Sequence, residues 1–270
     1  MRYILVLLLA LFELNAGVVK SPILTLDNDA DKATIKIDKI DVGMSGFIVH
    51  EIVPGRTSIL KNAVVTGYDS GSQVATLEMS DYTGLRNNAL PTGNWSVKLG
   101  DKAVFAFGYS RALLIAPSEE VYHQVTKGVK IQWLHPDIFA TILSFRGHPT
   151  PLKEDFEAMS VASSLGLVFI YLEQKLFMVD AKSFKILTIN DAPLVQDSVV
   201  LPFYTRVQEI DAAWWGEGSN ELESYEPHYY ELLVEFNNKN RNLYEIIKNG
   251  DAKYHGLLDD FEIENEEIGN

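Results

Sequence analysis

The sequence contains no cysteine among its 270 residues. This absence excludes disulfide-stapled scaffolds, thiolate zinc sites, cysteine nucleophiles and a lipid-modified N-terminal Cys. A chain of this length can bury a core large enough to fold without disulfides. The absence of cysteine therefore excludes thiol-dependent sites and reactions, but it does not prevent folding.

Positive charge is also scarce, with 23 Lys and Arg against 37 Asp and Glu, which gives a formal net charge of −14. Proteins that follow nucleic-acid phosphates draw most of their affinity from clustered Lys and Arg, so we expect no nucleic-acid partner. Part of this charge lies in the last twenty residues, which contain seven acidic residues and one Lys. We interpret this C-terminus as an acidic, solvated segment.

Long hydrophobic runs are missing except at the N-terminus, where nine apolar residues, Ile4–Phe12, follow Arg2. This run is too short to span a bilayer, which takes about 20 apolar residues. A positive charge, a short apolar stretch and a small residue at Ala16 are typical of a secretory signal peptide. We predict a signal peptide over 1–16, cleavage after Ala16, and a periplasmic mature protein without a transmembrane segment.

Short apolar–polar alternations with tight turns fill residues 17–108 and predict a β-rich domain, an antiparallel barrel or sandwich. Trp95–Leu99 is among the predicted strands. Gly108-Tyr109-Ser110 is interpreted as a hairpin turn between the strands 103–107 and 112–116.

Helical spacing begins after this turn. Residues 109–212 alternate helices with strands and predict an α/β domain, and 213–270 form an aromatic-rich, acidic helical segment. The predicted fold class is α+β: a small antiparallel β-barrel or sandwich, a mixed α/β layer domain, and C-terminal helices.

Three short motifs imitate functional sites without the context that each requires. Gly108–Ala112 has the outline of a nucleophile elbow around Ser110, but a strand follows where a helix is needed. Ser58–Lys61 has the spacing of a serine acyl-transferase but is strand-like, and Asp27–Asp31 begins like a calcium loop with Lys32 in the place of its glycine. We predict no catalytic residue, no cofactor and no metal, since the six histidines form no ligand motif either.

Aromatic residues crowd the final third of the sequence and leave two interpretations open. They could pack the core between the α/β domain and the C-terminal helices, or they could anchor a protein partner. Adjacent Trp214 and Trp215 cannot both point inward from a strand. The candidate partner-binding residues are Phe203, Tyr204, Arg206, Asp211, Trp214 and Trp215.

Three stretches resemble one family. Leu114–Pro117, Leu90–Thr92 and above all Pro202–Ala212 are similar to the N-terminal domain of plasminogen-binding protein A, a family of Campylobacter- and Helicobacter-type bacteria. The resemblance extends to about Phe236. It implies capture of plasminogen, whose kringle modules recognise exposed lysines, and it brings no catalytic residue.

Two functions are therefore expected. Because the sequence ends at Ile268-Gly269-Asn270 without a terminal Lys, the first is a non-enzymatic periplasmic scaffold, an accessory of an envelope machine such as the polar flagellar motor. Its partners would be other periplasmic or envelope proteins. The alternative is a surface protein that binds plasminogen or another host ligand.

Overall fold

A computed structural model describes residues 17–263 except 28, 30, 83, 85–94, 195 and 197. The predicted signal peptide and the Leu90–Thr92 stretch lie outside the described residues. The chain divides into two compact units. The first comprises residues 110–178 and 188–232, and the second comprises residues 17–109, 179–187 and the chain from Leu233 onward.

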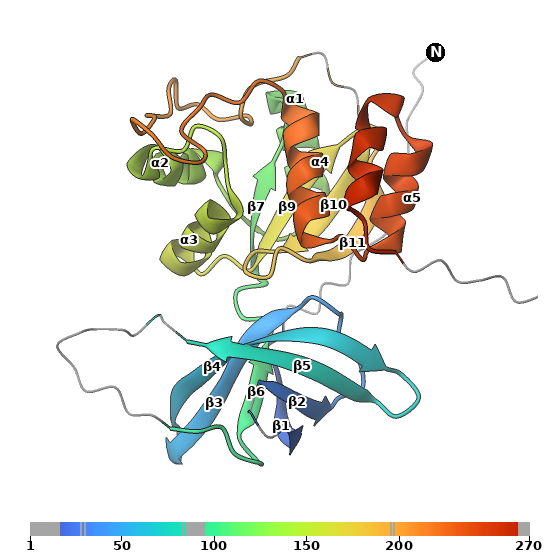
Figure 1. Cartoon of the computed structure of the whole chain (residues 1–270). Helices are drawn as coiled ribbons and strands as arrows, with labels where there is room; N and C mark the ends of the chain where they lie inside the picture. Colours follow the sequence, from blue (N-terminus) through green and yellow to red (C-terminus); the bar gives the residue numbers. More distant parts are fainter. Residues whose placement is uncertain are drawn as a thin grey trace, which may run out of the picture. The chain divides into compact units, whose positions relative to one another are not determined.

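The second unit contains a closed barrel in which six strands pair in the order β1-β2-β5-β4-β3-β6 (Figure 1). All of its pairings are antiparallel. Closure removes the open sheet edges that would otherwise recruit other chains. The strands are β1 Val19–Leu26, β2 Lys32–Lys36, β3 Ser45–Val53, β4 Arg56–Asp69, β5 Val74–Asp81 and β6 Lys102–Phe105.

Successive side chains in a strand point to opposite faces, so every second side chain of these strands points into the barrel and fills its interior. On β2 the buried residues are Ala33 and Ile35, and on β5 Ala75 and Leu77 point inward in the same manner. Phe105 of β6 is fully buried. Small and large side chains thus share the interior, and the predicted antiparallel barrel is confirmed.

A five-stranded sheet has the order β11-β10-β9-β7-β8. Within this sheet β7 is parallel to both of its neighbours, β8 and β9. The two-residue connection Glu173–Gln174 between β9 and β10 can join only antiparallel strands, so the sheet is mixed. The strands are β7 Arg111–Ile115, β8 Gln132–Leu134, β9 Leu167–Leu172, β10 Lys175–Asp180 and β11 Ile186–Asp191.

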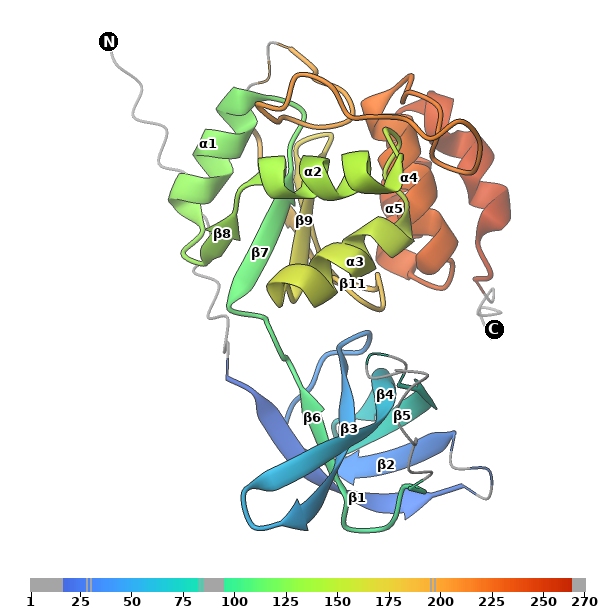
Figure 2. The same ribbon diagram turned by 90° about the vertical axis from the view of Figure 1, so that its left-hand side faces the viewer.

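Residues that favour the start of a helix stand at the N-termini of α1 and α2. Ser118 accepts a hydrogen bond from the Val121 N–H at the start of α1, and Pro136 occupies the first turn of α2. Figure 2 shows α2 and α3 lying beside β7 and β9. None of the helices in the described part of the chain is long and apolar enough to cross a membrane. The helices are α1 Glu119–Gly128, α2 Pro136–Arg146, α3 Lys153–Ser163, α4 Tyr225–Phe236, α5 Arg241–Asn249 and the 3-10 helix Ala252–Asp260.

Two local predictions were wrong. Gly108-Tyr109-Ser110 is not a hairpin turn, because β6 before it belongs to the barrel and β7 after it to the five-stranded sheet. Trp95–Leu99 is not a strand, although Val97 is buried and its neighbours are exposed as the alternation suggested. The Asp101 carboxylate accepts the Lys98 N–H at 2.8 Å, so this backbone group bonds within a turn instead of a ladder.

Candidate functional site

The predicted partner-binding residues lie on one segment of the first unit, residues 198–224, which we call the strap. Figure 1 shows the strap in orange, running over the end of the sheet toward which β7 points. In open parallel sheets this edge, outside the carboxyl ends of the strands, is where ligands bind. Here the Val200 N–H donates to Pro117 O at 2.7 Å and the Tyr204 N–H to Ala116 O at 2.8 Å. The strap therefore occupies the edge directly after β7.

Phe203 fastens the first half of the strap, residues 198–206, to the core. Its side chain is fully buried and stacks on Phe139 of α2, with the ring centroids 5.4 Å apart. The Tyr229 hydroxyl donates to Pro202 O at 3.0 Å from the α4 side. Phe203 is thus a core residue of this unit and presents no surface to a partner.

Tyr204 joins a cluster of rings at the starts of α1 and α2. Its ring centroid lies 5.3 Å from that of Tyr122 and 6.5 Å from that of His135. Burial raises the pKa of the Tyr204 hydroxyl, and the neighbouring Glu119 raises it further. Burial also lowers the pKa of His135, although the neighbouring Asp137 opposes this shift. The half-buried Tyr204 thus belongs mainly to this packed cluster.

Asp137 at the start of α2 holds the end of the strap's first half. Its carboxylate accepts the Thr205 hydroxyl at 2.9 Å, the Arg206 N–H at 2.8 Å and the Arg206 guanidinium at 2.7 Å. Burial opposes its ionisation, but these hydrogen bonds outweigh burial and lower the pKa of Asp137 to about 2. Arg206 is therefore an anchor of the strap whose charge is already compensated.

The second half of the strap, residues 207–224, follows the C-terminal end of α2. The Asp211 N–H donates to the Ser144 hydroxyl at 2.8 Å, and this hydroxyl donates back to the Asp211 carboxylate at 2.9 Å. The Ala213 N–H donates to Gly147 O at 2.8 Å. Only backbone and small polar groups make these contacts, so this half is held without burying a large side chain.

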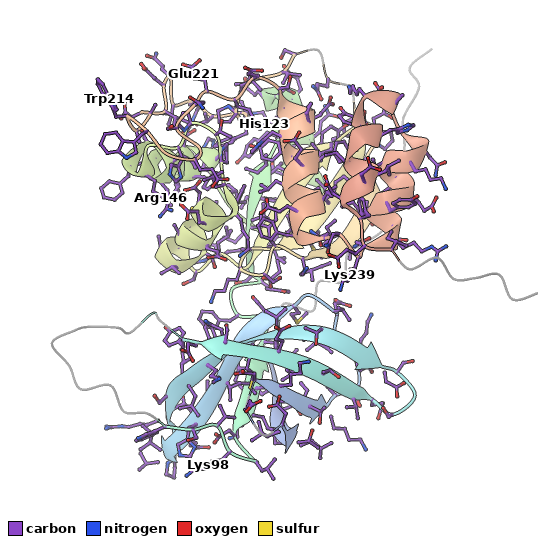
Figure 3. The ribbon with its side chains drawn as sticks, viewed as in Figure 1. Lys98, His123, Arg146, Trp214, Glu221 and Lys239 are labelled. Atoms are coloured by element: carbon purple, nitrogen blue, oxygen red, sulfur yellow. The ribbon has the colours of Figure 1, made fainter. Side chains whose placement is uncertain are left out.

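Trp214 and Trp215 project from this half into solvent. Trp214 is 94% exposed and Trp215 is 80% exposed. Figure 3 shows the Trp214 side chain pointing outward from the strap beside α2. Phe145 of α2, which is 93% exposed, is the neighbour of Ser144, and Trp214 is the neighbour of Ala213. The hydrogen bonds of Ser144 and Ala213 therefore bring Phe145, Trp214 and Trp215 to one region, which we call the aromatic patch.

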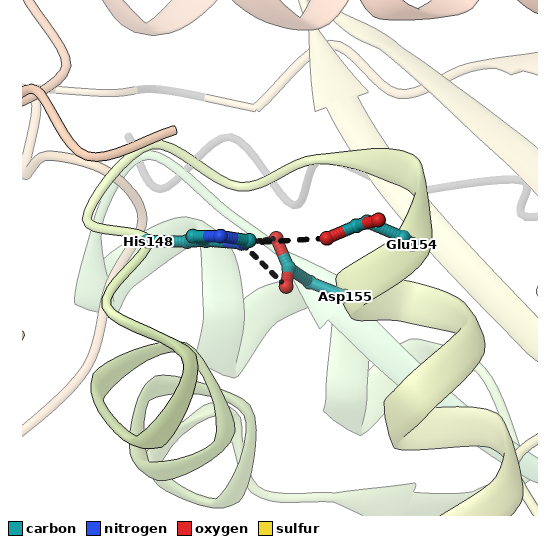
Figure 4. A group of neighbouring side chains, drawn as sticks. All are labelled: His148, Glu154 and Asp155. Atoms are coloured by element: carbon teal, nitrogen blue, oxygen red, sulfur yellow. Dashed lines mark hydrogen bonds and ion pairs between the residues drawn. The ribbon is translucent and has the colours of Figure 1, made fainter. Parts of the chain in front are cut away.

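A second cluster, His148, Glu154 and Asp155, has donor atoms within 4.8 Å of one another and could in principle hold a metal ion (Figure 4). The buried Asp155 carboxylate is already saturated: it accepts the Arg146 guanidinium at 2.5 Å, His148 Nδ1 at 2.9 Å and the Leu152 N–H at 2.8 Å. Arg146 also pairs with Glu154. An internal cation thus compensates the carboxylates, and the cluster ties α2 to the start of α3.

Residues of the other candidate motifs make ion pairs or hydrogen bonds that hold local structure. Lys61, three residues after Ser58, pairs with Asp31 at 3.0 Å. The Asp27 carboxylate accepts the N–H groups of Asp31 and Lys32, which closes a turn. Ser110 is exposed between β6 and β7, and its carbonyl accepts the Gln132 N–H at 3.1 Å.

Phe145 is the residue of the aromatic patch that the sequence did not single out. The buried stripe of its helix is formed by Phe139, Ala140 and Leu143. Phe145 lies off this stripe, and a large aromatic on the outer face of an amphipathic helix is the signal that could have identified it.

Comparison with known proteins identifies the family. The model of the family "Plasminogen-binding protein pgbA N-terminal" matches residues 18–233. Plasminogen-binding protein PgbA of Helicobacter pylori strain J99 is 27% identical over 214 residues, which cover 76% of this chain and 46% of that protein. The same protein of strain 26695 is 26% identical and is covered over 42% of its length, so the match spans less than half of these relatives. No solved structure matches the chain. The chain therefore belongs to the family of PgbA N-terminal domains.

Proposed function

We propose that this protein is an exported, non-catalytic protein-binding module that contacts its partner through the aromatic patch. The observation that carries the proposal is the exposure of Trp214 and Trp215 on a well-fastened segment. A contiguous exposed apolar patch on a soluble protein marks an interaction site, and Trp is enriched among the residues that dominate binding energy. The strap occupies the sheet edge where a small-molecule ligand would bind, which favours a macromolecular partner.

The names of the relatives favour the second of the two expected functions. Both are plasminogen-binding proteins, and neither name refers to a motor or scaffold. We therefore take plasminogen as the first partner to test. The envelope-scaffold function and the periplasmic location remain predictions from the sequence.

The test measures binding of the purified mature chain, residues 17–270, to immobilised plasminogen. We expect saturable binding that weakens by about 2 kcal/mol, or roughly thirtyfold in Kd, in the double variant Trp214→Ala/Trp215→Ala. The matched control is Phe107→Ala, because Phe107 is a half-exposed aromatic of the second unit. Absence of saturable binding would reject plasminogen, and equal affinity of the double variant would reject the aromatic patch.

A lysine analogue separates two routes of binding. If a kringle of plasminogen captured a lysine of this chain, the analogue would compete with the chain for that kringle. Binding through the aromatic patch predicts that part of the interaction resists the analogue and is lost in the double Trp variant. Complete competition in wild type would reject the patch as the contact for plasminogen.

A further inference from the structure

Acidic residues surround the aromatic patch along the second half of the strap. From Val207 to Ser224 the sequence contains no Lys or Arg. Figure 3 places Glu221 on the same strap as Trp214. The acids of this stretch are all exposed, and they are Glu209, Asp211, Glu217, Glu221 and Glu223.

Two cations that flank the second half of the strap in its contacts, Arg206 and Arg146, each have carboxylate partners already. Arg206 pairs with Asp137 at 2.7 Å. Arg146 pairs with Asp155 at 2.5 Å and also with Glu154. The second half of the strap, residues 207–224, therefore carries a net negative charge and contains no Lys or Arg.

Two physical terms then favour the same kind of ligand. The face of an indole ring attracts a cation, with Trp the best of the aromatic side chains, and the attraction grows when the pair is desolvated. Five exposed carboxylates raise the local concentration of cationic partners and repel acidic ones. An aromatic patch in a neutral surround would select apolar partners, whereas this one adds a strong preference for positive charge.

We propose that the aromatic patch is a docking surface for a cationic protein segment, in which Lys or Arg side chains lie over the Trp214 and Trp215 rings and pair with the surrounding carboxylates. This proposal rests on the proposed function and gives the partner's chemistry. It concerns the charge of the partner, so it holds for plasminogen or for an envelope protein alike.

The experiment is fluorescence polarisation with a labelled twelve-residue peptide of alternating Arg and Ser. Two control peptides carry Glu or norleucine in place of Arg. We expect wild-type protein to bind the Arg peptide and not the Glu peptide, and a rise from 50 to 500 mM salt to weaken binding by about tenfold because exposed charges are screened. Equal binding of the norleucine peptide would overturn the cationic preference.

Matched charge variants locate the effect. The triple variant Glu217→Gln/Glu221→Gln/Glu223→Gln is expected to bind the Arg peptide at least fivefold more weakly. The control Asp259→Asn/Asp260→Asn/Glu262→Gln changes the net charge equally at exposed positions of the second unit and is expected to bind as wild type. Equal weakening in both triple variants would overturn the proposal, because it would show a response to total charge.

The same variants distinguish failure of this proposal from failure of the proposed function. If the double Trp variant loses the protein partner while the charge variants and the salt series leave binding unchanged, the patch binds protein but does not select cations. If the double Trp variant keeps both the protein partner and the Arg peptide, both proposals are wrong.

Discussion

The strap contains two pairs of adjacent aromatic residues, Phe203 with Tyr204 and Trp214 with Trp215. The two pairs differ in how deeply their side chains are buried. Phe203 is fully buried against Phe139, whereas Trp214 is 94% exposed. The first pair lies where the strap crosses the end of the sheet, and the second lies where the strap follows the outer end of α2. Aromatic content alone therefore does not separate a core from a surface, and what decides is the element beneath each pair.

The two halves also differ in how they are fastened. The first half combines a buried ring, backbone hydrogen bonds to Ala116 and Pro117, and the ionised Asp137. The second half is held by hydrogen bonds to Ser144 and Gly147 at the end of α2, and by Thr150, whose N–H and hydroxyl donate to Gly218 O and Asn220 O. We expect changes in the first half to reduce the stability of the fold and changes in the second half to affect binding.

The largest effect is expected at Phe203. Phe203→Ala removes a fully buried ring and leaves a cavity beside Phe139, so the free energy of unfolding should fall by about 3–5 kcal/mol. Urea denaturation followed by circular dichroism measures this change. The exposed neighbour Leu201→Ala is the control and should change stability by less than about 1 kcal/mol. A loss below about 1 kcal/mol at Phe203 would contradict the assignment of the first half to the core.

A smaller effect is expected at Gly147, which joins α2 to the second half of the strap. Its φ of 75° is left-handed, and a Cβ here would lie 2.6 Å from the Ala213 backbone nitrogen. Gly147→Ala should therefore cost about 1–3 kcal/mol in the free energy of unfolding and displace Ala213. Gly216→Ala provides a control with a positive φ and open space around its Cβ. Equal costs at both glycines would show that the contact with Ala213 does not matter.

A pH-dependent effect of about 2 kcal/mol is expected at Asp137. Its pKa of about 2 lies below the value of 3.8 of an unperturbed Asp, so its contribution to stability is present above about pH 4 and is lost as the pH falls toward 2. Asp137→Asn should lower the melting temperature at pH 7 and reduce its decline between pH 4 and 2. Asp260→Asn, at an exposed position, should keep the wild-type profile. Identical profiles for wild type and Asp137→Asn would contradict this role.

The smallest effect on stability is expected in the second half. Trp214→Ala/Trp215→Ala removes two rings that are already in water, so the melting temperature should stay within about 2 °C of wild type and the free energy of unfolding within about 0.5 kcal/mol. Differential scanning fluorimetry measures this. A loss above about 2 kcal/mol would show that the rings stabilise the fold and would remove the contrast between the two halves.

Local patterns in the sequence predicted most of the elements, because period and caps are local properties. The apolar–polar alternation of Ala33–Lys36 lies on β2 and that of Ala75–Met79 on β5, and Pro136 and Gly147 stand at the two ends of α2. The hairpin at Gly108-Tyr109-Ser110 failed because turn residues look the same whether a chain returns to its sheet or passes to another one. Pairing between strands that are distant in the sequence decides which of the two occurs, and local sequence patterns do not reveal this pairing.

The candidate site was predictable only in part. The two aromatic pairs in the sequence point to the strap. Sequence alone places Phe203 and Trp214 in one candidate binding set, because both lie in the same aromatic-rich third of the chain. Their separation depends on Phe139 beneath one and solvent beside the other, which is tertiary information. The approach of Phe145 to Trp214 and Trp215 arises through the contacts of Ser144 and Gly147 with a segment more than sixty residues away, which local sequence patterns do not reveal.

The most direct test of the central claim is hydrogen–deuterium exchange of residues 17–270, alone and in the presence of plasminogen, the proposed partner. The aromatic patch predicts slower amide exchange in the complex over residues 143–147 and 211–217, with the barrel strands β1–β6 exchanging as in the free protein. Protection confined to the barrel strands, with 211–217 unchanged, would contradict it.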